Sequence, residues 1–212
     1  MILVGQYDSP FVRRVAITLQ LYSMPFKRNP ISVFGDAAEM ARINPLVRIP
    51  SLVLDDGEVL VESGAILDYL DERAGPSRAL TPRSGPERRH MLQVMAVATG
   101  TIDKVGAIIY ERHFHPGPKL NQDWVERLKG QAAGGLRWLE DRLTGDWFFD
   151  NELSQADIAA AVLVGYLHLR LQEILAEGAY PRLEALSRRC EALPAFVAAR
   201  PSPDELMPPP PR

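Results

Sequence analysis

The sequence predicts an α/β unit followed by an all-helical unit, and three observations carry this prediction. Over the first 75 residues, short apolar runs alternate with segments whose apolar residues recur at helical spacing. The pair Asp56-Gly57 stands between two apolar runs, which is typical of a β-hairpin. Beyond Pro82 the sequence shows helical periodicity and no further strand pattern. We therefore expect the order β-α-β-α-β-β-α in the first unit and helices in the second.

The first strand and the first helix follow each other at the N-terminus. Ile2 to Gln6 is a short apolar run, and Ser9-Pro10 has the serine cap and first-turn proline of a helix start. Phe26 to Val33 predicts the second strand. Because its Pro30 cannot donate to a strand ladder, we expect this strand at an edge of the sheet.

The rest of the first unit predicts a helix, a hairpin and a final helix. Asp36 to Glu39 resembles a capping box that opens a short helix, and this helix should end before Asn44-Pro45. Two strands should flank the Asp56-Gly57 turn, and Ser63 should cap a helix that runs through Arg73. A parallel βαβ unit followed by an antiparallel hairpin and a helix predicts a thioredoxin-like domain over residues 1–75.

The second unit is predicted to be all-α. After a turn-rich linker we expect helices over residues 85–114, 121–143 and 155–176, with shorter ones after Pro181 and Pro194. Ser154 and Asp157 form a capping-box pattern, and Asp157 should be buried because the following segment is apolar on all sides. The predicted domains are residues 1–75 and 83–200, with a proline-rich tail at 201–212 that is extended or disordered.

Composition and charge exclude several classes of protein. The 24 Lys and Arg against 27 Asp and Glu give a net charge of −3 without long runs of one sign, which argues against a DNA-binding face. Cys190 is the only cysteine, so an intramolecular disulfide and cysteine-based zinc sites are excluded. The longest apolar run, Ile158 to Leu167, is far shorter than the ~20 residues that span a bilayer. We expect a cytoplasmic protein with neither nucleic acid nor membrane as a partner.

Three positions in the first unit are candidates for binding an anionic or peptide-like ligand. Ser9 lies where the first strand gives way to the first helix, so its hydroxyl and the helix N–H groups could bind an anion; the alternative is a plain helix cap. Ile49-Pro50 suits a cis bond that would let the Ile49 backbone pair with an extended ligand, or else a simple turn. Glu62-Ser63 could hold an ammonium and a carboxylate, although a glutamate before a capping serine is common.

Taken together and in this order, the motifs resemble the glutathione transferase superfamily over the whole chain except the tail. The Ser-Pro-Phe segment at residues 9–11 is most similar to the tau class of plants and to a related group of bacterial transferases, whereas the omega class has cysteine at that serine. The matching segments are Tyr7 to Arg14, Asn44 to Pro50, Glu62 to Leu70 and Leu153 to Asp157.

The resemblance implies that Ser9 provides the catalytic hydroxyl, which hydrogen-bonds the sulfur of glutathione. Tyr7 is the competing donor, since other classes place a tyrosine at the end of the first strand. We favour Ser9 because the Ser-Pro-Phe match puts the active serine there. The bound thiolate would then be the nucleophile that attacks a small apolar electrophile.

The same resemblance implies the remaining contacts with glutathione. The backbone of Ile49 would pair with the cysteinyl unit beside a cis Pro50, and Glu62 with Ser63 would hold the γ-glutamyl amine and carboxylate. The other residues implied to contact glutathione are Phe11 and, near the glycyl end, Arg48.

The second unit should contribute the electrophile pocket near Tyr110 and Phe114, whose spacing puts both rings on one helix face, although packing between helices would explain them equally well. Ser154 and Asp157 match the structural capping box of the superfamily. No metal site is expected, because His113 and His115 lie two residues apart and do not share a helix face. The resemblance also implies a homodimer.

The predicted function is therefore that of a glutathione transferase with glutathione as co-substrate. One alternative is a glutathione-dependent peroxidase or reductase, but a mixed-disulfide mechanism would require a cysteine at the position of Ser9. The other alternative is a non-catalytic protein that binds ligands or partners. The intact set of site motifs argues against it, although fold and motifs do not prove turnover.

Overall fold

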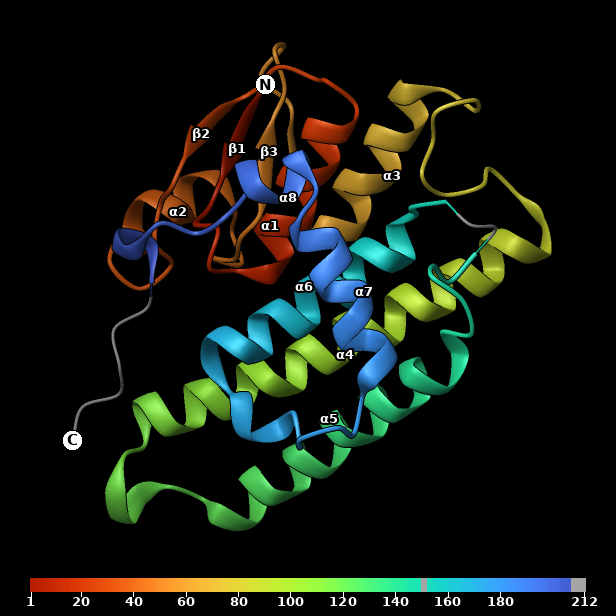
Figure 1. The fold of residues 1–212 in the computed structure, drawn as a ribbon. Coiled ribbons are helices and arrows are strands. Elements are labelled where there is room, and N and C mark those ends of the chain that lie inside the picture. Colours follow the sequence, from red (N-terminus) through yellow and green to blue (C-terminus); the bar gives the residue numbers. More distant parts are fainter. Residues whose placement is uncertain (150–151, 207–212) are drawn as a thin grey trace. The chain divides into compact units, whose positions relative to one another are not determined.

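The computed structural model describes residues 1–149 and 152–206. The chain divides into two compact units: residues 1–83 together with 192–206, and residues 84–191. The predicted class, a thioredoxin-like α/β unit followed by a helical unit, is confirmed (Figure 1). The division differs from the predicted one in its second boundary, because residues 192–206 pack with the first unit and not with the helices.

The first unit is built on a mixed sheet with strand order β2-β1-β3-β4. Its strands are β1 (Ile2–Val4), β2 (Lys27–Asn29), β3 (Ser51–Val53) and β4 (Val59–Val61). Strand β1 pairs in parallel with β2 and antiparallel with β3, and β3 pairs antiparallel with β4 across the predicted hairpin. Strand β2 lies at an edge, as predicted, and it ends just before Pro30, which has no N–H to donate.

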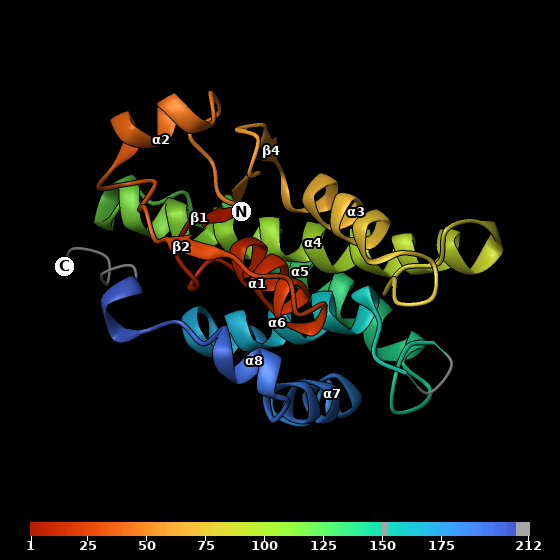
Figure 2. The ribbon, with the colours of Figure 1, turned by 90° about the horizontal axis from the view of Figure 1, so that it is seen from above.

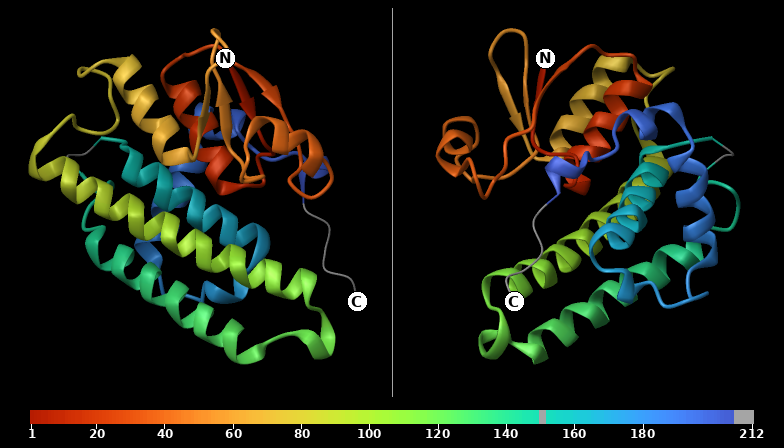
Figure 3. Two further views of the ribbon diagram at one scale, coloured as in Figure 1. Left: turned by 180° about the vertical axis from the view of Figure 1, so that it is seen from behind. Right: turned by 60° about the vertical axis from the view of Figure 1, so that its left-hand side comes forward.

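Helices cover both faces of this sheet. Helices α1 (Pro10–Leu21) and α3 (Ser63–Ala74) pack against each other on one face, and α2 (Ala37–Ile43) lies on the other (Figure 3). Helix α8 (Pro194–Ala198) packs against α1 (Figure 2). Because the C-terminal part of the chain supplies α8, the first unit is completed by residues far from it in sequence.

The alternation of side chains along β1 gives each face its own apolar core. Val4 belongs to a cluster with Ile31 and Met40 on the α2 side. The neighbouring Leu3 pairs with Leu52 of β3, and both side chains are buried. Since successive strand residues point to opposite faces, Leu3 and Leu52 pack toward α1 and α3.

Two helix starts of the first unit differ from the predicted ones. The Asp36 carboxylate makes no cap bond to α2 and instead accepts the N–H of Ser32 at 3.0 Å, so the expected capping box with Glu39 does not form. Helix α3 begins at Ser63 itself, and the cap position belongs to Glu62. This shift of one residue places the helix N-terminus directly at the predicted ligand-binding pair.

The second unit consists of α4 (Gly85–Phe114), α5 (Gln122–Arg142), α6 (Gln155–Arg170) and α7 (Pro181–Glu191). Helix α4 packs against α5 and α6, and α6 packs against α7 (Figure 3). By length and mean hydropathy α4 alone among the described helices could cross a membrane; 39% of its apolar stretch is buried in this structure. Short 3₁₀ turns at residues 117–119 and 172–174 follow α4 and α6, so α6 ends earlier than predicted.

The predicted capping box at the start of α6 is present. Asp157 Oδ2 accepts the N–H of Ser154 at 2.8 Å and its hydroxyl at 2.6 Å, while Oδ1 accepts the N–H of Phe148 at 2.9 Å. Asp157 is fully buried, as expected, and burial raises the pKa of its carboxyl. These contacts give the pair a structural role in joining the loop before α6 to the helix.

The C-terminal segment is more ordered than its proline content suggests. Residues Pro203–Glu205 form a 3₁₀ turn within the first unit, and Ser202 caps it (Figure 1). The expectation of an extended or disordered tail is thus wrong for residues 202–205. The remaining part of that prediction, residues 207–212, lies outside the described residues.

Candidate functional site

Ser9 occupies the predicted junction between β1 and α1. Its backbone is extended (φ −75°, ψ 120°), and its carbonyl accepts the N–H of Arg13 at 2.9 Å as a cap residue should. Its side chain, however, makes no cap hydrogen bond to α1. The half-buried hydroxyl is therefore not used to satisfy the helix end, and the first N–H groups of α1 lie beside it.

Gly5 shows how closely the segment before Ser9 packs against Ile49. Its φ of +127° lies in a region that L-residues with side chains rarely adopt. A Cβ at this position would lie 2.6 Å from Val12 Cγ2 and 2.8 Å from Ile49 Cβ. The end of β1, helix α1 and Ile49 thus meet at one corner of the first unit, which brings two of the predicted site elements together.

The turn before Ile49 is stabilised by Asn44, for which the sequence indicated the end of a helix and a matching segment but no side-chain role. Asn44 is 1% exposed; its Nδ2 donates to the carbonyl of Arg48 at 2.9 Å and its Oδ1 accepts the N–H of Leu46 at 3.0 Å. The Ile49-Pro50 peptide bond is cis, and β3 begins at the next residue. An Asn followed by Pro before a predicted strand is typical of a turn in which the Asn side chain bonds the backbone, and this pattern could have indicated the role of Asn44.

The third element, Glu62-Ser63, lies at the start of α3. Glu62 has φ +67°, a conformation that costs a non-glycine residue roughly 1 kcal/mol or more and that is often found at functional sites. Its exposed carboxylate Oε1 lies 3.4 Å from Nη1 of Arg48. Ser63 is 4% exposed and forms the first residue of the helix. The structure therefore places the predicted residues Arg48 and Glu62 side by side.

Tyr7, the competing donor, lies in a different environment from Ser9. Its side chain is 2% exposed, and the guanidinium carbon of Arg28 lies 3.5 Å from the centre of its ring. Burial raises the pKa of the Tyr7 hydroxyl, and the nearby Arg28 opposes this shift in part. Tyr7 is thus packed under a cation, whereas Ser9 is partly open to solvent.

Arg13, in the first matching segment, links α1 to the segment that contains α8. Its Nε donates to the carbonyl of Ala199 at 3.1 Å, and its guanidinium lies 5.8 Å from the ring centre of Phe196. The side chain is 7% exposed and ties α1 to α8. Phe11, in the first turn of α1, is half-buried next to Ser9 in sequence. Its contact with glutathione stays a prediction.

Tyr110 and Phe114 lie near the end of α4 in the helical unit. Their side chains are 47% and 53% exposed, and the rings meet edge to face with centroids 6.2 Å apart. The shared face that their spacing predicts is therefore present. Their exposure makes them accessible to an apolar molecule, and their assignment to an electrophile pocket stays a prediction.

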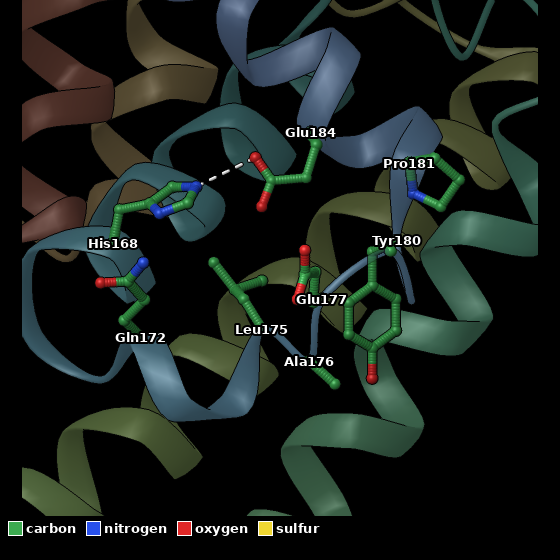
Figure 4. Close-up of a pocket in the computed structure, with 9 residues that line it drawn as sticks. His168, Gln172, Leu175, Ala176, Glu177, Tyr180, Pro181 and Glu184 are labelled. Atoms are coloured by element: carbon green, nitrogen blue, oxygen red, sulfur yellow. Dashed lines mark hydrogen bonds and ion pairs between the residues drawn. The ribbon is translucent and has the colours of Figure 1, made fainter.

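The helical unit contains a cavity of about 390 Å³ that the sequence did not suggest (Figure 4). On one side His168 Nε2 and Glu184 Oε2 lie 2.9 Å apart. None of the predicted site residues lines this cavity. Its lining residues are His168, Gln172, Leu175, Ala176, Glu177, Gly178, Tyr180, Pro181 and Glu184.

Cys190 is fully buried, and burial raises the pKa of its thiol to about 12. A thiol with so high a pKa is almost entirely protonated at neutral pH and is a poor nucleophile. The neighbouring Arg188 and Arg189 do not offset the effect of burial. The Cys190 thiol is thus a poor candidate for a catalytic nucleophile.

Comparison with known proteins follows the same division of the chain. Residues 3–78 match the N-terminal domain of glutathione S-transferases, and residues 122–189 match their C-terminal domain. An uncharacterized glutathione S-transferase-like protein of Escherichia coli, YibF, is 30% identical over 170 residues, which are 80% of this chain and 83% of YibF. The chain belongs to the glutathione S-transferase family.

Two further relatives cover almost all of this glutathione S-transferase family member. The maleylacetoacetate isomerase of Pseudomonas aeruginosa is 29% identical over 213 residues, covering 95% of this chain and 96% of that enzyme. A glutathione S-transferase from Methylobacterium radiotolerans, solved in complex with glutathione sulfonate, superposes with a TM-score of 0.88 at 29% identity and covers 94% of each chain.

Proposed function

We propose that this protein binds glutathione on its first unit and that Ser9 activates the thiol for attack on an electrophile. The observation that carries the proposal is that Ser9 stands at the cap of α1 while its hydroxyl makes no cap bond. A hydroxyl in that position can donate to a thiolate, and the adjacent helix N–H groups favour negative charge. The glutathione sulfonate in the Methylobacterium radiotolerans structure supports glutathione as the ligand.

The energetics of thiol activation agree with a single hydroxyl donor. A free thiol with a pKa of about 8.5 is only a few per cent thiolate at pH 7. Lowering that pKa by two requires about 2.7 kcal/mol of preferential thiolate stabilisation. A hydrogen bond to a charged acceptor contributes about 1.5–3 kcal/mol and a helix N-terminus about 0.3–1 kcal/mol. Together the two contributions amount to about 1.8–4 kcal/mol, a range that includes the required stabilisation.

The other elements of the site supply donors and acceptors that suit the remainder of glutathione. The Glu62 carboxylate would hold the γ-glutamyl ammonium, and the N-terminus of α3 at Ser63 would receive the γ-glutamyl carboxylate. The backbone of Ile49, just before β3, would pair with the cysteinyl unit. Arg48 would have to leave its 3.4 Å contact with Glu62 in order to face the glycyl carboxylate, because the two ends of an extended tripeptide lie farther apart than that.

In the proposed reaction the thiolate sulfur forms a bond to an electrophilic carbon. In a displacement, the bond from that carbon to the leaving group breaks and the leaving group keeps the electron pair. In an addition to an activated double bond, the electron pair of the double bond ends on the distal carbon, which takes a proton from solvent. Both routes need only the bound thiolate in position beside the substrate.

A second candidate function is glutathione-dependent isomerisation of a cis double bond. The similarity to the maleylacetoacetate isomerase of Pseudomonas aeruginosa, over 95% of this chain, favours it. Here the thiolate would add to the double bond, the resulting single bond would rotate, and elimination of the thiolate would restore the double bond in the trans form. Glutathione is regenerated, so the same site serves both candidates and they differ in the fate of the adduct.

Product analysis separates the two candidates. The purified protein is incubated with glutathione and either an aryl halide or maleylacetoacetate, and products are followed by chromatography. Conjugate that accumulates with glutathione consumed supports transfer; the trans isomer with glutathione unchanged supports isomerisation. Ser9→Ala should lower either activity, whereas Tyr7→Phe, which removes the rival hydroxyl, should leave it near that of the wild type. Glutathione binding without turnover of any substrate would instead support the non-catalytic alternative.

A further inference from the structure

The 3₁₀ turn Pro203–Glu205 contains a buried carboxylate, that of Glu205. Glu205 Oε2 accepts the N–H and the hydroxyl of Ser202, each at 3.1 Å, in a capping box that sets the turn. The Glu205 residue is only 6% exposed. One carboxylate oxygen thus shapes the local turn and leaves the other for partners elsewhere in the first unit.

That second oxygen contacts the segment that leads to Ser9. Glu205 Oε1 accepts the backbone N–H of Tyr7 at 3.0 Å, across 198 positions of sequence, and forms an ion pair with Arg28. Arg28 in turn covers the Tyr7 ring. Three residues from the first strand–helix connection, strand β2 and the C-terminal turn therefore form one cluster, Tyr7–Arg28–Glu205.

The cluster adds a hydrogen bond in the middle of the connection between β1 and α1. The N–H of Gly5 donates to the carbonyl of Asn29 at 2.8 Å, and the N–H of Ser9 donates to the carbonyl of Gln6 at 3.2 Å. Between these two anchors, Tyr7 is buried and its N–H has Glu205 as acceptor. Without that carboxylate the buried N–H of Tyr7 would lose its acceptor, which favours a shift of the connection toward another acceptor.

We propose that Glu205 is a positioning residue for Ser9. By fixing the backbone at Tyr7 it holds the hydroxyl of Ser9 at the place where the sulfur of glutathione is bound. This inference rests on the proposed function of Ser9. Glu205 is buried and acts through the Tyr7 backbone, so its removal should impair thiolate formation more than glutathione binding.

The test measures the pKa of bound glutathione from the ultraviolet absorbance of its thiolate, together with kcat and the KM for glutathione. In Glu205→Ala we expect the thiol pKa to rise toward the free value of about 8.5 and kcat to fall roughly ten-fold or more, with a smaller change in KM. Glu205→Gln keeps a neutral acceptor for the Tyr7 N–H, so the pKa of the bound thiol should stay close to that of the wild type. The matched control is Asp204→Ala, an exposed neighbour in the same turn, which should behave like the wild type.

A double variant shows whether Glu205 acts through Ser9. In Ser9→Ala/Glu205→Ala the thiol pKa should equal that of Ser9→Ala alone, because the hydroxyl that Glu205 positions is already absent. Additive shifts, or a Glu205→Ala protein that loses thermal stability with the thiol pKa unchanged, would overturn the proposal. If Glu205→Ala does not fold, Glu205→Asp, whose shorter side chain withdraws the carboxylate from Tyr7, takes its place with the same expected rise. An unchanged thiol pKa in Ser9→Ala would instead show that the proposed function itself is wrong.

Discussion

The guanidinium of Arg48 lies 3.4 Å from the carboxylate of Glu62, and the two residues come from different sides of the β3–β4 hairpin. Both side chains are about half exposed, so the pair contributes little to stability. Glu62 nevertheless keeps an unfavourable backbone conformation at the N-terminus of α3. Because this weak ion pair is the only polar contact of the side chain among the described residues, the strained backbone of Glu62 agrees with the proposal that Glu62 binds a ligand.

Replacing Glu62 should therefore weaken glutathione binding while leaving the fold intact. Removing a charge-assisted hydrogen bond to the ligand ammonium costs about 1.5–3 kcal/mol, so Glu62→Gln should lower affinity roughly 10- to 150-fold by calorimetry. The control is Glu58→Gln, a change at an exposed glutamate of the same hairpin. Equal affinity in the two variants would refute the assignment of Glu62.

Gly5→Ala should destabilise the corner that carries Ser9. The new methyl group would meet Val12 Cγ2 at 2.6 Å, and the φ of +127° is unsuited to alanine. We expect the free energy of unfolding, measured in urea, to fall by roughly 1–3 kcal/mol, and glutathione binding to weaken.

Gly130→Ala in α5 serves as the contrasting substitution, because nothing lies within 4 Å of its Cβ position. Helix propensity at this position predicts that Gly130→Ala raises the free energy of unfolding by roughly 0.5–1 kcal/mol. If the two alanines had the same effect, steric conflict at Gly5 could not be its cause.

Asp71 predicts a specific dependence of stability on pH. It accepts the hydroxyl of Tyr22 in a buried contact between α3 and the end of α1, and burial raises the pKa of its carboxyl. A raised pKa means that the folded state holds this proton more tightly than the unfolded state. The contribution of Asp71 to stability should thus fall as pH rises from about 4, the unfolded pKa, through the raised folded pKa.

The measurement compares urea unfolding of the wild type and Asp71→Asn across this range. Asparagine cannot titrate, so the stability of the variant should decline less steeply with rising pH than that of the wild type. Glu72→Gln, at an exposed position of the same helix, should keep the wild-type slope. Parallel curves for wild type and Asp71→Asn would contradict the prediction.

Glu140 should be important for the stability of the helical unit. Its carboxylate accepts the N–H groups of Arg182 and Leu183, each at 2.9 Å, and so satisfies the first turn of α7 from α5. Glu140→Ala leaves both donors without this acceptor and should cost about 1–3 kcal/mol of unfolding free energy. The adjacent exposed Asp141 provides the control, since Asp141→Ala should change stability by less than about 0.5 kcal/mol.

Local patterns predicted most of the secondary structure. Helix α4 has the bounds that its periodicity indicated, and Asp56-Gly57 forms the turn of the hairpin. The prediction of a capping box at Asp36 was wrong: the carboxylate accepts the N–H of Ser32 in the preceding turn and makes no cap bond to α2. Helix α6 ends at Arg170, although its apolar pattern continues beyond that residue.

The contacts that sequence reasoning missed join residues that are distant along the chain. Glu205 meets Tyr7 and Arg28, and Glu140 meets the start of α7; neither glutamate stands out by its local sequence. Such pairs follow from the way the elements pack, which periodicity does not specify. The places of Ser9, Ile49 and Glu62 at element boundaries could be predicted, because each has its own local signature; their roles in binding glutathione stay predictions.

The central claim is that Ser9 stabilises the thiolate of bound glutathione, and titration of that thiol by its ultraviolet absorbance tests it most directly. In the wild type the bound thiol should have a pKa well below the free value of about 8.5. In Ser9→Ala the pKa should return most of the way to that value, while Tyr7→Phe should match the wild type. A Ser9→Ala protein that binds glutathione with the wild-type thiol pKa would contradict the claim.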